Sequence, residues 1–213
     1  MKFTLHLYRR ILTTLGIGFC VLTINSACSS PPKFVKVPQL TPAPAAASGN
    51  ALVIFLRPSG YPALGPSPLF DVTDETRVLA VPDPHTKTGI LLPAGIHRFM
   101  VIMENVDFID ADLLPGKTYY ILISPRVGFS LPHFRLIAFK RHPSEPAYAV
   151  GGSQLKTWLD ACTPIGNAPG FDAFWGPKQM KKLNERKDEG LAKWAKAEAS
   201  VKQVHYLAPE DGE

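Results

Sequence analysis

From residue 51 to residue 139, short apolar runs alternate with Gly and Pro, and this pattern predicts β-strands. Leu79 and Val81 lie two positions apart in their run, as on a half-buried sheet face, and so do Ile121 and Ile123. The expected strands are ALVIFLR from Ala51, LFDVT from Leu69, RVLAV from Arg77, GILL from Gly89, IHRFMVIME from Ile96, VDFIDADL from Val106, KTYYILIS from Lys117 and HFRLIAF from His133. About eight strands with closely spaced turns favour a mainly β fold, an antiparallel sandwich or barrel, and of these we expect the antiparallel β-sandwich.

Helical spacing replaces the strand pattern near the C-terminal end. Ser153 is expected to cap a helix over residues 154–161, because its hydroxyl oxygen can accept an unpaired backbone N–H of the first turn. Pro177 is expected at the first position of a longer helix running toward His205, since proline fits the first helical turn. The sequence therefore predicts a C-terminal helical extension over residues 151–213.

The longer helix carries an apolar seam that is interrupted twice. Its apolar positions recur at intervals of about three and four residues: Met180, Leu183, Trp194, Ala197, Val201 and Val204. Lys187 and Gly190 interrupt this seam, so the helix is expected to pack through only part of its length. Phe171, Phe174 and Trp175 precede the helix and add aromatic surface. Either these side chains cover a face of the sandwich, or together with Trp194 they form an exposed surface for a partner protein.

The N-terminal segment is typical of an export signal. Lys2, Arg9 and Arg10 form a basic start, and residues 11–24 are apolar apart from small or hydroxylated residues. Fourteen residues are fewer than the ~20 that a membrane-spanning helix needs, so the segment is expected to be cleaved. We therefore expect a signal peptide over residues 1–27.

Small residues precede Cys28, and this arrangement resembles the lipobox of bacterial lipoproteins. In that family the cysteine becomes the acylated first residue, so the resemblance implies a lipid anchor at Cys28. The sequence departs from the pattern at Asn25, where the family prefers an aliphatic residue. Ordinary cleavage after Ala27, which would release a soluble secreted or periplasmic protein, therefore stays open. Ser29 stands where an aspartate in this family often retains the protein at the inner membrane, so it favours the outer membrane.

Residues 28–49 separate the cysteine from the first expected strand. They are rich in Pro and Ala and show no periodicity, which is typical of an extended linker. At ~3.1 Å per residue, 21 residues reach about 60 Å, enough to hold a domain clear of lipid headgroups. The alternative is that Phe34, Val35 and Val37 pack on the domain.

The strand region also carries short motifs at its turns. Phe55-Leu56-Arg57 ends one strand on arginine, Pro93-Ala94-Gly95 forms a turn, and Gly116-Lys117 leads into Tyr119-Tyr120. With these motifs, residues 51–140 resemble a family of small exported bacterial domains of unknown function, similar to PEGA-type and immunoglobulin-like sandwiches. The resemblance implies a sandwich in the cell envelope and carries no activity.

The charge of the chain is close to balanced once the signal is removed. The whole sequence has 23 basic and 18 acidic residues, a net charge of +5. Removal of Lys2, Arg9 and Arg10 leaves 20 basic residues and a net charge of +2. No basic cluster is visible outside the mixed-charge tail, so no nucleic-acid partner is expected.

Cysteine usage excludes an intramolecular disulfide. Cys20 leaves with the signal and Cys28 is expected to be acylated, so Cys162 remains alone. Cys162 is then either a small buried apolar residue or a link to a second chain.

The carboxylates and serines show no catalytic pattern. Asp107, Asp110 and Asp112 lack the spacing of a calcium loop and are expected to be solvent-facing charges on a sheet. Ser153 lacks the trailing glycine of a nucleophile elbow. No catalytic residue is therefore assigned.

The histidines show no zinc-binding spacing. They are expected mostly in loops or at the surface: His85, His97, His133, His142 and His205. No metal and no cofactor is therefore assigned.

These expectations describe an envelope lipoprotein with four parts: a signal peptide (1–27), a lipidated cysteine and linker (28–49), a sandwich (50–150) and a helical tail (151–213). We expect a non-catalytic binding or scaffold module at the outer membrane, facing the periplasm, with the membrane and an envelope protein as partners. The alternative is an anchored or secreted hydrolase. A pocket uniting two or more of four side chains would favour the hydrolase: His97, Asp110, Asp112 and His133. An apolar groove beside Trp175 and Trp194 would favour the module.

Overall fold

The computed structural model describes residues 35–36, 49–59, 67–103, 105–126, 133–167 and 171–213. The expected signal peptide and the lipidation site Cys28 lie outside these residues, as does most of the linker. Among the described helices, none is long and apolar enough to cross a membrane.

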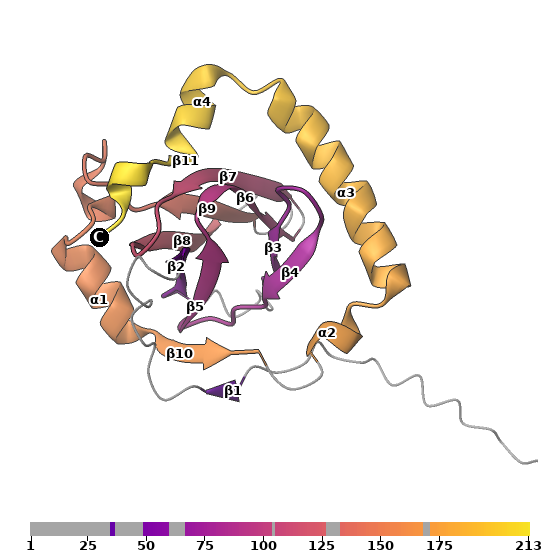
Figure 1. The fold of residues 1–213 in the computed structure, drawn as a ribbon, viewed down its shortest axis with the longest axis horizontal. Helices are drawn as coiled ribbons and strands as arrows, with labels where there is room; N and C mark the ends of the chain where they lie inside the picture. The colour runs from indigo at the N-terminus through magenta and orange to yellow at the C-terminus, as the bar shows by residue number, and fades with distance from the viewer. Residues whose placement is uncertain (1–34, 37–48, 60–66, 104, 127–132, 168–170) are drawn as a thin grey trace, which may run out of the picture. The chain divides into compact units, whose positions relative to one another are not determined.

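All eight expected strands are present, and the chain is mainly β (Figure 1). They are β2 (Asn50–Arg57), β3 (Leu69–Asp71), β4 (Arg77–Ala80), β5 (Thr86–Pro93), β6 (Gly95–Ile102), β7 (Val106–Leu113), β8 (Thr118–Arg126) and β9 (His133–Ala138). Three short strands were not expected: β1 (Val35–Lys36), β10 (Thr163–Gly166) and β11 (Tyr206–Leu207). The first lies in the expected linker, and the other two lie in the expected helical tail.

The strands form two mixed sheets. One has the order β1-β10-β5-β2-β8-β9 and the other has the order β11-β7-β6-β3-β4. The prediction of an antiparallel arrangement is not confirmed, because β2 pairs in parallel with β8, β10 with β5, and β11 with β7. Five strands lie between β2 and β8 along the chain, so reversal at every turn returns β8 to the direction of β2. Strand alternation in the sequence does not reveal which strands become neighbours.

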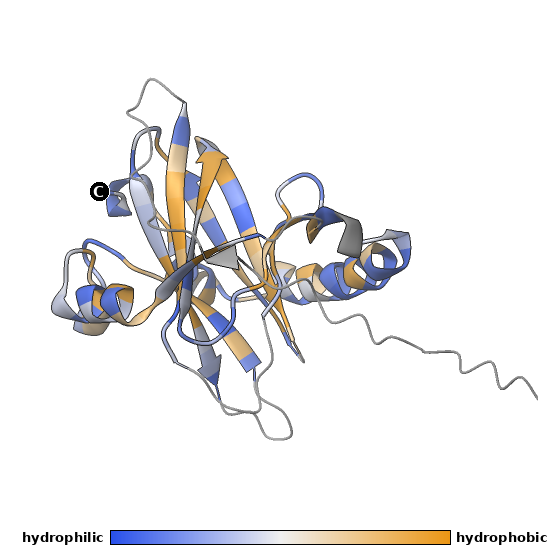
Figure 2. Cartoon of the chain, turned by 90° about the horizontal axis from the view of Figure 1, so that it is seen from below, coloured by the Kyte–Doolittle hydropathy of each residue, from blue (hydrophilic) through white to orange (hydrophobic). Residues whose placement is uncertain are grey.

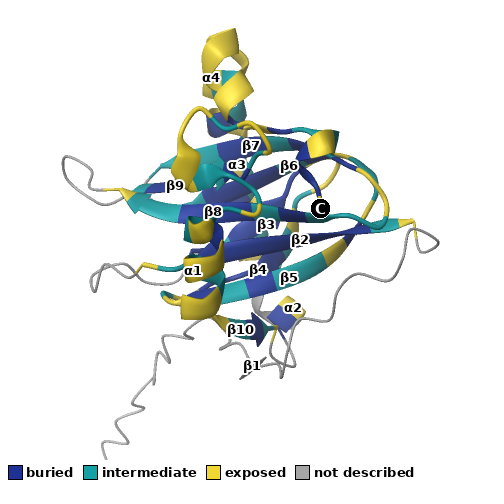
Figure 3. Cartoon of the chain, turned by 90° about the vertical axis from the view of Figure 1, so that its left-hand side faces the viewer, coloured by how far each residue is buried: buried dark blue, intermediate teal, exposed yellow. Residues whose placement is uncertain are grey.

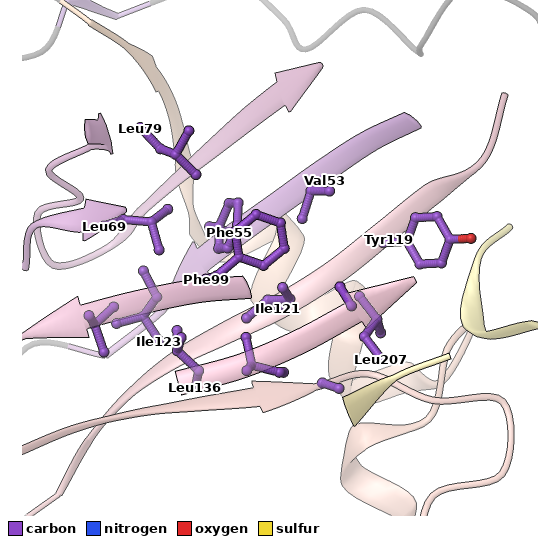
Figure 4. Packing of buried hydrophobic residues seen from close by; sticks show 14 of the residues in the cluster. Val53, Phe55, Leu69, Leu79, Phe99, Tyr119, Ile121, Ile123, Leu136 and Leu207 are labelled. Carbon is purple, nitrogen blue, oxygen red and sulfur yellow. The ribbon is translucent and has the colours of Figure 1, made fainter. Parts of the chain in front are cut away.

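The central core lies between the facing sides of the two sheets (Figure 4). Val53 and Phe55 of β2 enter this cluster, while Leu52 and Ile54 point to the opposite face of the same sheet. Burial on both faces explains why β2 is a continuous apolar run. Phe55 meets Phe99 of β6 edge to face, with 5.2 Å between ring centroids.

Helix α1 (Ser153–Ala161) covers the outer face of the β2-containing sheet. Leu155 is buried there, and Trp158 and Leu159 pack against the same cluster. Figure 3 shows the exposed outer side of α1 beside the buried β2. The expectation that Ser153 caps this helix is wrong, because Gly152 is the N-cap and the helix has no side-chain cap hydrogen bond.

Helix α3 (Pro177–Ala195) packs on the outer face of the other sheet. Pro177 opens it as expected, and Figure 2 shows hydrophobic and hydrophilic residues on its different sides. The helix stops at Ala195, and a separate helix α4 (Ala199–Val204) follows. Gly190 does not interrupt the packing as expected: a Cβ there would lie 2.9 Å from Cγ1 of Val106, so the glycine permits close approach of helix and sheet.

The C-terminal segment returns from α4 to both sheets. Leu207 in β11 pairs beside β7, and Glu213 exchanges backbone hydrogen bonds with Thr118 of β8 at 2.9 and 3.0 Å. Between them lies the short 3-10 helix η3 (Pro209–Asp211), and the hydroxyl of Tyr119 donates to the carbonyl of Pro209 at 3.0 Å. The chain is therefore attached to both sheets again after α3 and α4.

Candidate functional site

The aromatic residues proposed as a partner surface lie on α2 (Phe171–Phe174), α3 and the turn between them. Phe171 is buried, and the half-buried Trp175 ring contacts Phe70 of β3 with 5.7 Å between centroids. Trp194 contacts Phe108 of β7 at 6.0 Å. The side chain of Phe174 lies outside the described residues. The rings of Trp175 and Trp194 therefore pack toward the sheet, and Phe171 packs on Trp175 with 6.3 Å between centroids.

The four side chains that would favour a hydrolase are not brought together. Asp110 is paired with Arg98 through two hydrogen bonds of 2.5 and 3.0 Å. Asp110 lines a hollow with Arg98 and Trp194, while His97, Asp112 and His133 line neither this hollow nor the two described below. No group of three or more metal-binding side chains occurs in that part of the chain either.

His97 is buried, so its expected place in a loop or at the surface is wrong. Its Nδ1 lies 2.9 Å from Oδ2 of Asp71, and its Nε2 lies 2.8 Å from the carbonyl oxygen of Pro93. The hydrogen bond to Asp71 raises the pKa of His97. Burial opposes ionisation of Asp71, but hydrogen bonds from His97 and Thr73 outweigh it, and the pKa of Asp71 is lowered. Each ring nitrogen of His97 therefore has a hydrogen-bond acceptor beside it, so the protonated ring, which donates from both nitrogens, suits the site.

Two further reactive groups are buried in structural positions. Arg57 donates to the carbonyl of Pro82 at 3.0 Å and lies 4.6 Å from the ring centroid of Phe134, and burial lowers its pKa to about 10. Cys162 is buried beneath α1, and burial raises the pKa of its thiol to about 11. A protonated, covered thiol is poorly suited to nucleophilic chemistry.

A hollow of about 410 Å³ lies beside the edge strand β9, and we call it the β9 groove. Its volume is within the range of small-ligand sites. It is lined by Arg126, Arg135, Leu136, Ile137, Ala138, Lys140, His142, Pro143, Ser144, Glu145, Tyr148, Gln203, Val204 and His205. These residues come from the end of β8, from β9 and the loop after it, from the 3-10 helix η2 (Pro146–Tyr148) and from α4.

The β9 groove is strongly cationic. Arg126, Arg135 and Lys140 line it, and Glu145 is the single carboxylate among its lining residues. The sequence showed no such cluster, because the three cations lie on separate segments, each within an ordinary polar or alternating pattern. Pairing of β8 with β9 brings two of these segments together. Sequence reasoning therefore missed this cationic groove.

Arg135 is held in the groove by His205. A guanidinium can only donate, so the 3.3 Å contact between Nη2 of Arg135 and Nε2 of His205 makes Nε2 the acceptor. The proton of a neutral His205 is then on Nδ1, which lies 3.0 Å from the carbonyl oxygen of Phe108 and donates to it. His205 is buried, contrary to expectation, and its acceptor nitrogen is occupied by Arg135.

Asp107 lies beside the Arg135–His205 pair and contacts His205 at Nδ1, the nitrogen that faces away from Arg135. Its Oδ2 lies 3.8 Å from Nδ1 of His205 and accepts the backbone N–H of Leu136 at 2.7 Å. Burial raises the pKa of Asp107 against the opposing influence of His205. The expectation of a solvent-facing carboxylate is therefore wrong for Asp107, whose strand turns this side chain toward β9.

The outer edge of β9 is closed by side chains. Asn105 donates to the carbonyl of Phe134 at 3.0 Å and accepts its N–H at 3.2 Å. Asp107 accepts the next outward N–H, from Leu136. These bonds occupy backbone groups of Phe134 and Leu136 that an added strand would use, so the side chains of the groove are the better contacts for a ligand.

A second hollow, of about 450 Å³, meets the β9 groove at Arg135 and His205, which line both. We call it the α3 hollow, because α3 forms one wall. Its other described walls come from β7, from the α3–α4 junction and from α4.

Comparisons with protein-family models, curated proteins and solved structures found no match to this chain. The functional argument therefore depends on the geometry of the grooves and on the sequence signals.

Proposed function

We propose that this protein is a non-catalytic binding module of the bacterial cell envelope that holds an acidic ligand in the β9 groove. The observation that carries the proposal is the convergence of Arg126, Arg135 and Lys140 on one hollow. Positive charges gathered around a concave surface raise the local electrostatic potential and attract anions. Glu145 offsets only part of that charge.

Binding fits the groove better than hydrolysis does. A general base needs a free acceptor nitrogen within reach of the substrate. His205 is the buried histidine at this groove, and its Nε2 accepts from Arg135. His205 therefore acts as a positioning residue that aims Arg135, and the alternative of an anchored or secreted hydrolase gains no support from it.

The expected location supports a tethered binding module. We propose that Cys28 carries the lipid anchor, since two or more acyl chains hold a protein stably at a bilayer. The outer membrane facing the periplasm is the proposed site, with a secreted or periplasmic soluble protein as the alternative. We further propose that the two mixed sheets form a sandwich related to PEGA-type domains, with the C-terminal helices as an extension that supplies one wall of the groove.

A photo-crosslinking residue in living cells tests the groove. Gln203 lies in its lining and is exposed, whereas Gln179 is exposed on α3 and lines none of the described hollows. We expect a discrete mass increase of the intact protein when the crosslinker replaces Gln203 and none when it replaces Gln179. Charge reversal by Arg126→Glu should abolish the adduct. An adduct that survives this reversal, or that forms equally at both positions, would contradict the proposal.

Labelling with a tagged fatty acid tests the anchor separately. The wild-type chain should take up the label, and a Cys28→Ala variant should not. Equal labelling of both proteins would remove Cys28 as the anchor and leave the groove proposal unaffected.

A further inference from the structure

We propose, as an extension that rests on the proposed function, that the ligand is a single-chain anionic amphiphile. Its acidic head would lie at Arg126 and Arg135 in the β9 groove, and its apolar chain would enter the α3 hollow. Arg135 and His205 line both hollows, so a ligand with two unlike ends could contact this pair from both sides.

The α3 hollow has a mixed lining, in which apolar side chains from β7, α3 and α4 stand beside charged ones. Val106 and Phe108 of β7 face Trp194 of α3, and Ala197 and Val201 complete the far side. Gly190 has no side chain, and this lets α3 approach Val106 and Phe108 closely beside the hollow. This combination of an aromatic ring and small apolar residues suits an alkyl chain more than a second charged group.

Helix α4 also points to an amphiphile. Val201 and Val204 are 43% and 54% exposed, although both are apolar. Val201 lines the α3 hollow and Val204 lines the β9 groove, so each contributes uncovered apolar surface to one of them. An occupant with an alkyl chain would cover such surface, whereas a free inorganic anion would leave it in water.

The charged residues of the α3 hollow are compatible with a chain at its centre. Arg186 donates to the carbonyl of Met103, and Asp107 is held by Leu136 and His205. Glu189 and Lys193 are exposed on α3, four residues apart and of opposite charge. The cations Arg186 and Lys193 balance the two carboxylates of this lining, so the hollow carries no net negative charge that would repel the acidic head at Arg135.

Matched alkyl phosphates test this assignment on an exported full chain with Cys28→Ser, which needs no detergent. The probes are inorganic phosphate, butyl phosphate and decyl phosphate, each kept below its micelle concentration. Binding is followed by calorimetry and by the fluorescence of Trp194, with Trp194→Phe identifying its signal. Decyl phosphate should bind at least about 100-fold more tightly than butyl phosphate if the added methylenes leave water.

Filling the α3 hollow provides the matched comparison. Ala197→Phe should weaken decyl phosphate at least about tenfold and leave butyl phosphate within about twofold. Ala192 is exposed on α3 and lines none of the described hollows, so Ala192→Phe should change neither affinity.

The outcomes separate the two proposals. Equal binding of butyl and decyl phosphate, with both weakened by Arg126→Gln, would overturn the amphiphile and keep an acidic ligand. Tight binding of decyl phosphate that is unchanged in the Ala197→Phe variant would show that the alkyl chain does not enter the α3 hollow. Probe binding that is absent, or unchanged by Arg126→Gln and Arg135→Gln, would contradict the proposed function itself.

Discussion

The two helices that cover the sheets do so in different ways. Helix α1 lies over a continuous aromatic cluster, in which the buried Phe139 ring meets Tyr120, Tyr148 and Trp158 with centroid distances of 5.9–6.5 Å. Helix α3 packs on its sheet through Met180, Leu183, Leu191 and Trp194, and the α3 hollow is lined by residues of α3 and β7 beside this contact. One face is closed by large rings, and the other retains space.

This difference indicates that a ligand can bind at the face covered by α3 without disrupting the fold. A close-packed face has no volume to give to a ligand, and any change there creates a cavity or a clash. A helix that is fixed at a few points can border a hollow while the rest of the face stays buried. The structural and ligand-binding roles can therefore be separated by mutation.

The largest effect is expected at the centre of the closed face. Phe139→Ala removes a fully buried ring and its three aromatic neighbours' contacts, and it should lower the free energy of unfolding by about 4 kcal/mol. Trp194→Ala on the hollowed face should cost only about half as much, because its side chain is partly exposed. Urea unfolding monitored by circular dichroism measures both. Equal losses would remove the proposed contrast between the faces.

The next effect concerns residues 206–213, which fix the chain to both sheets after α3 and α4. We call this segment the C-terminal clasp. Asp211 is buried and accepts the backbone N–H groups of Arg141 at 2.8 Å and Ala208 at 2.9 Å. Asp211→Ala leaves both donors unpaired and should cost about 2–3 kcal/mol.

Hydrogen exchange locates that loss. In Asp211→Ala, backbone amides should exchange faster in α3 and α4 than in α1, because α1 is held by its own packing on the β2-containing sheet. Uniform acceleration in all three helices would show that the clasp supports the whole fold and not one face.

The strands were predictable from sequence because their signal is local. Apolar runs between turn residues identified β2 to β9, and Pro177 identified the start of α3. The short β10 and β11 escaped because each pairs with a strand distant in the chain and has almost no pattern of its own. Pairing partners are tertiary information.

The candidate site was not predictable for the same reason. Arg126, Arg135 and Lys140 each look like ordinary exposed charges, and only the pairing of strands and the return of α4 bring them to one hollow. Burial of His97 and His205 likewise depends on acceptors far away in the chain: Asp71 for His97 and the Phe108 carbonyl for His205. The aromatic residues were visible in the sequence, but their orientation was not.

A smaller effect is expected where α3 approaches its sheet most closely. In Gly190→Ala the new Cβ would lie 2.9 Å from Cγ1 and 3.1 Å from Cβ of Val106, a stiff β-branched residue. Overpacking should exceed the gain in helix propensity and leave a net loss of about 1 kcal/mol in unfolding free energy. Ala192→Gly on the exposed side measures the propensity contribution alone. A stabilised Gly190→Ala variant would show that α3 can move away from β7 at little cost.

The smallest effect should not distinguish the faces, because Asp71 and His97 lie on strands of the shared core. The pKa of His97 is raised in the folded state, so its contribution to stability is complete below its unfolded pKa of about 6.5 and is lost as pH rises through the folded value. The pKa of Asp71 is lowered, so its contribution is present above about 3.8 and is lost as pH falls through the folded value. Unfolding free energy should therefore be higher at about pH 5 than at about pH 8, and His97→Gln should reduce that difference. Hydrogen-exchange protection factors, which correct for the intrinsic pH dependence of exchange, should fall together in α1 and α3 at the higher pH. A fall confined to α3 would place the pair in the hollowed face and weaken the division between a common core and two unlike covers.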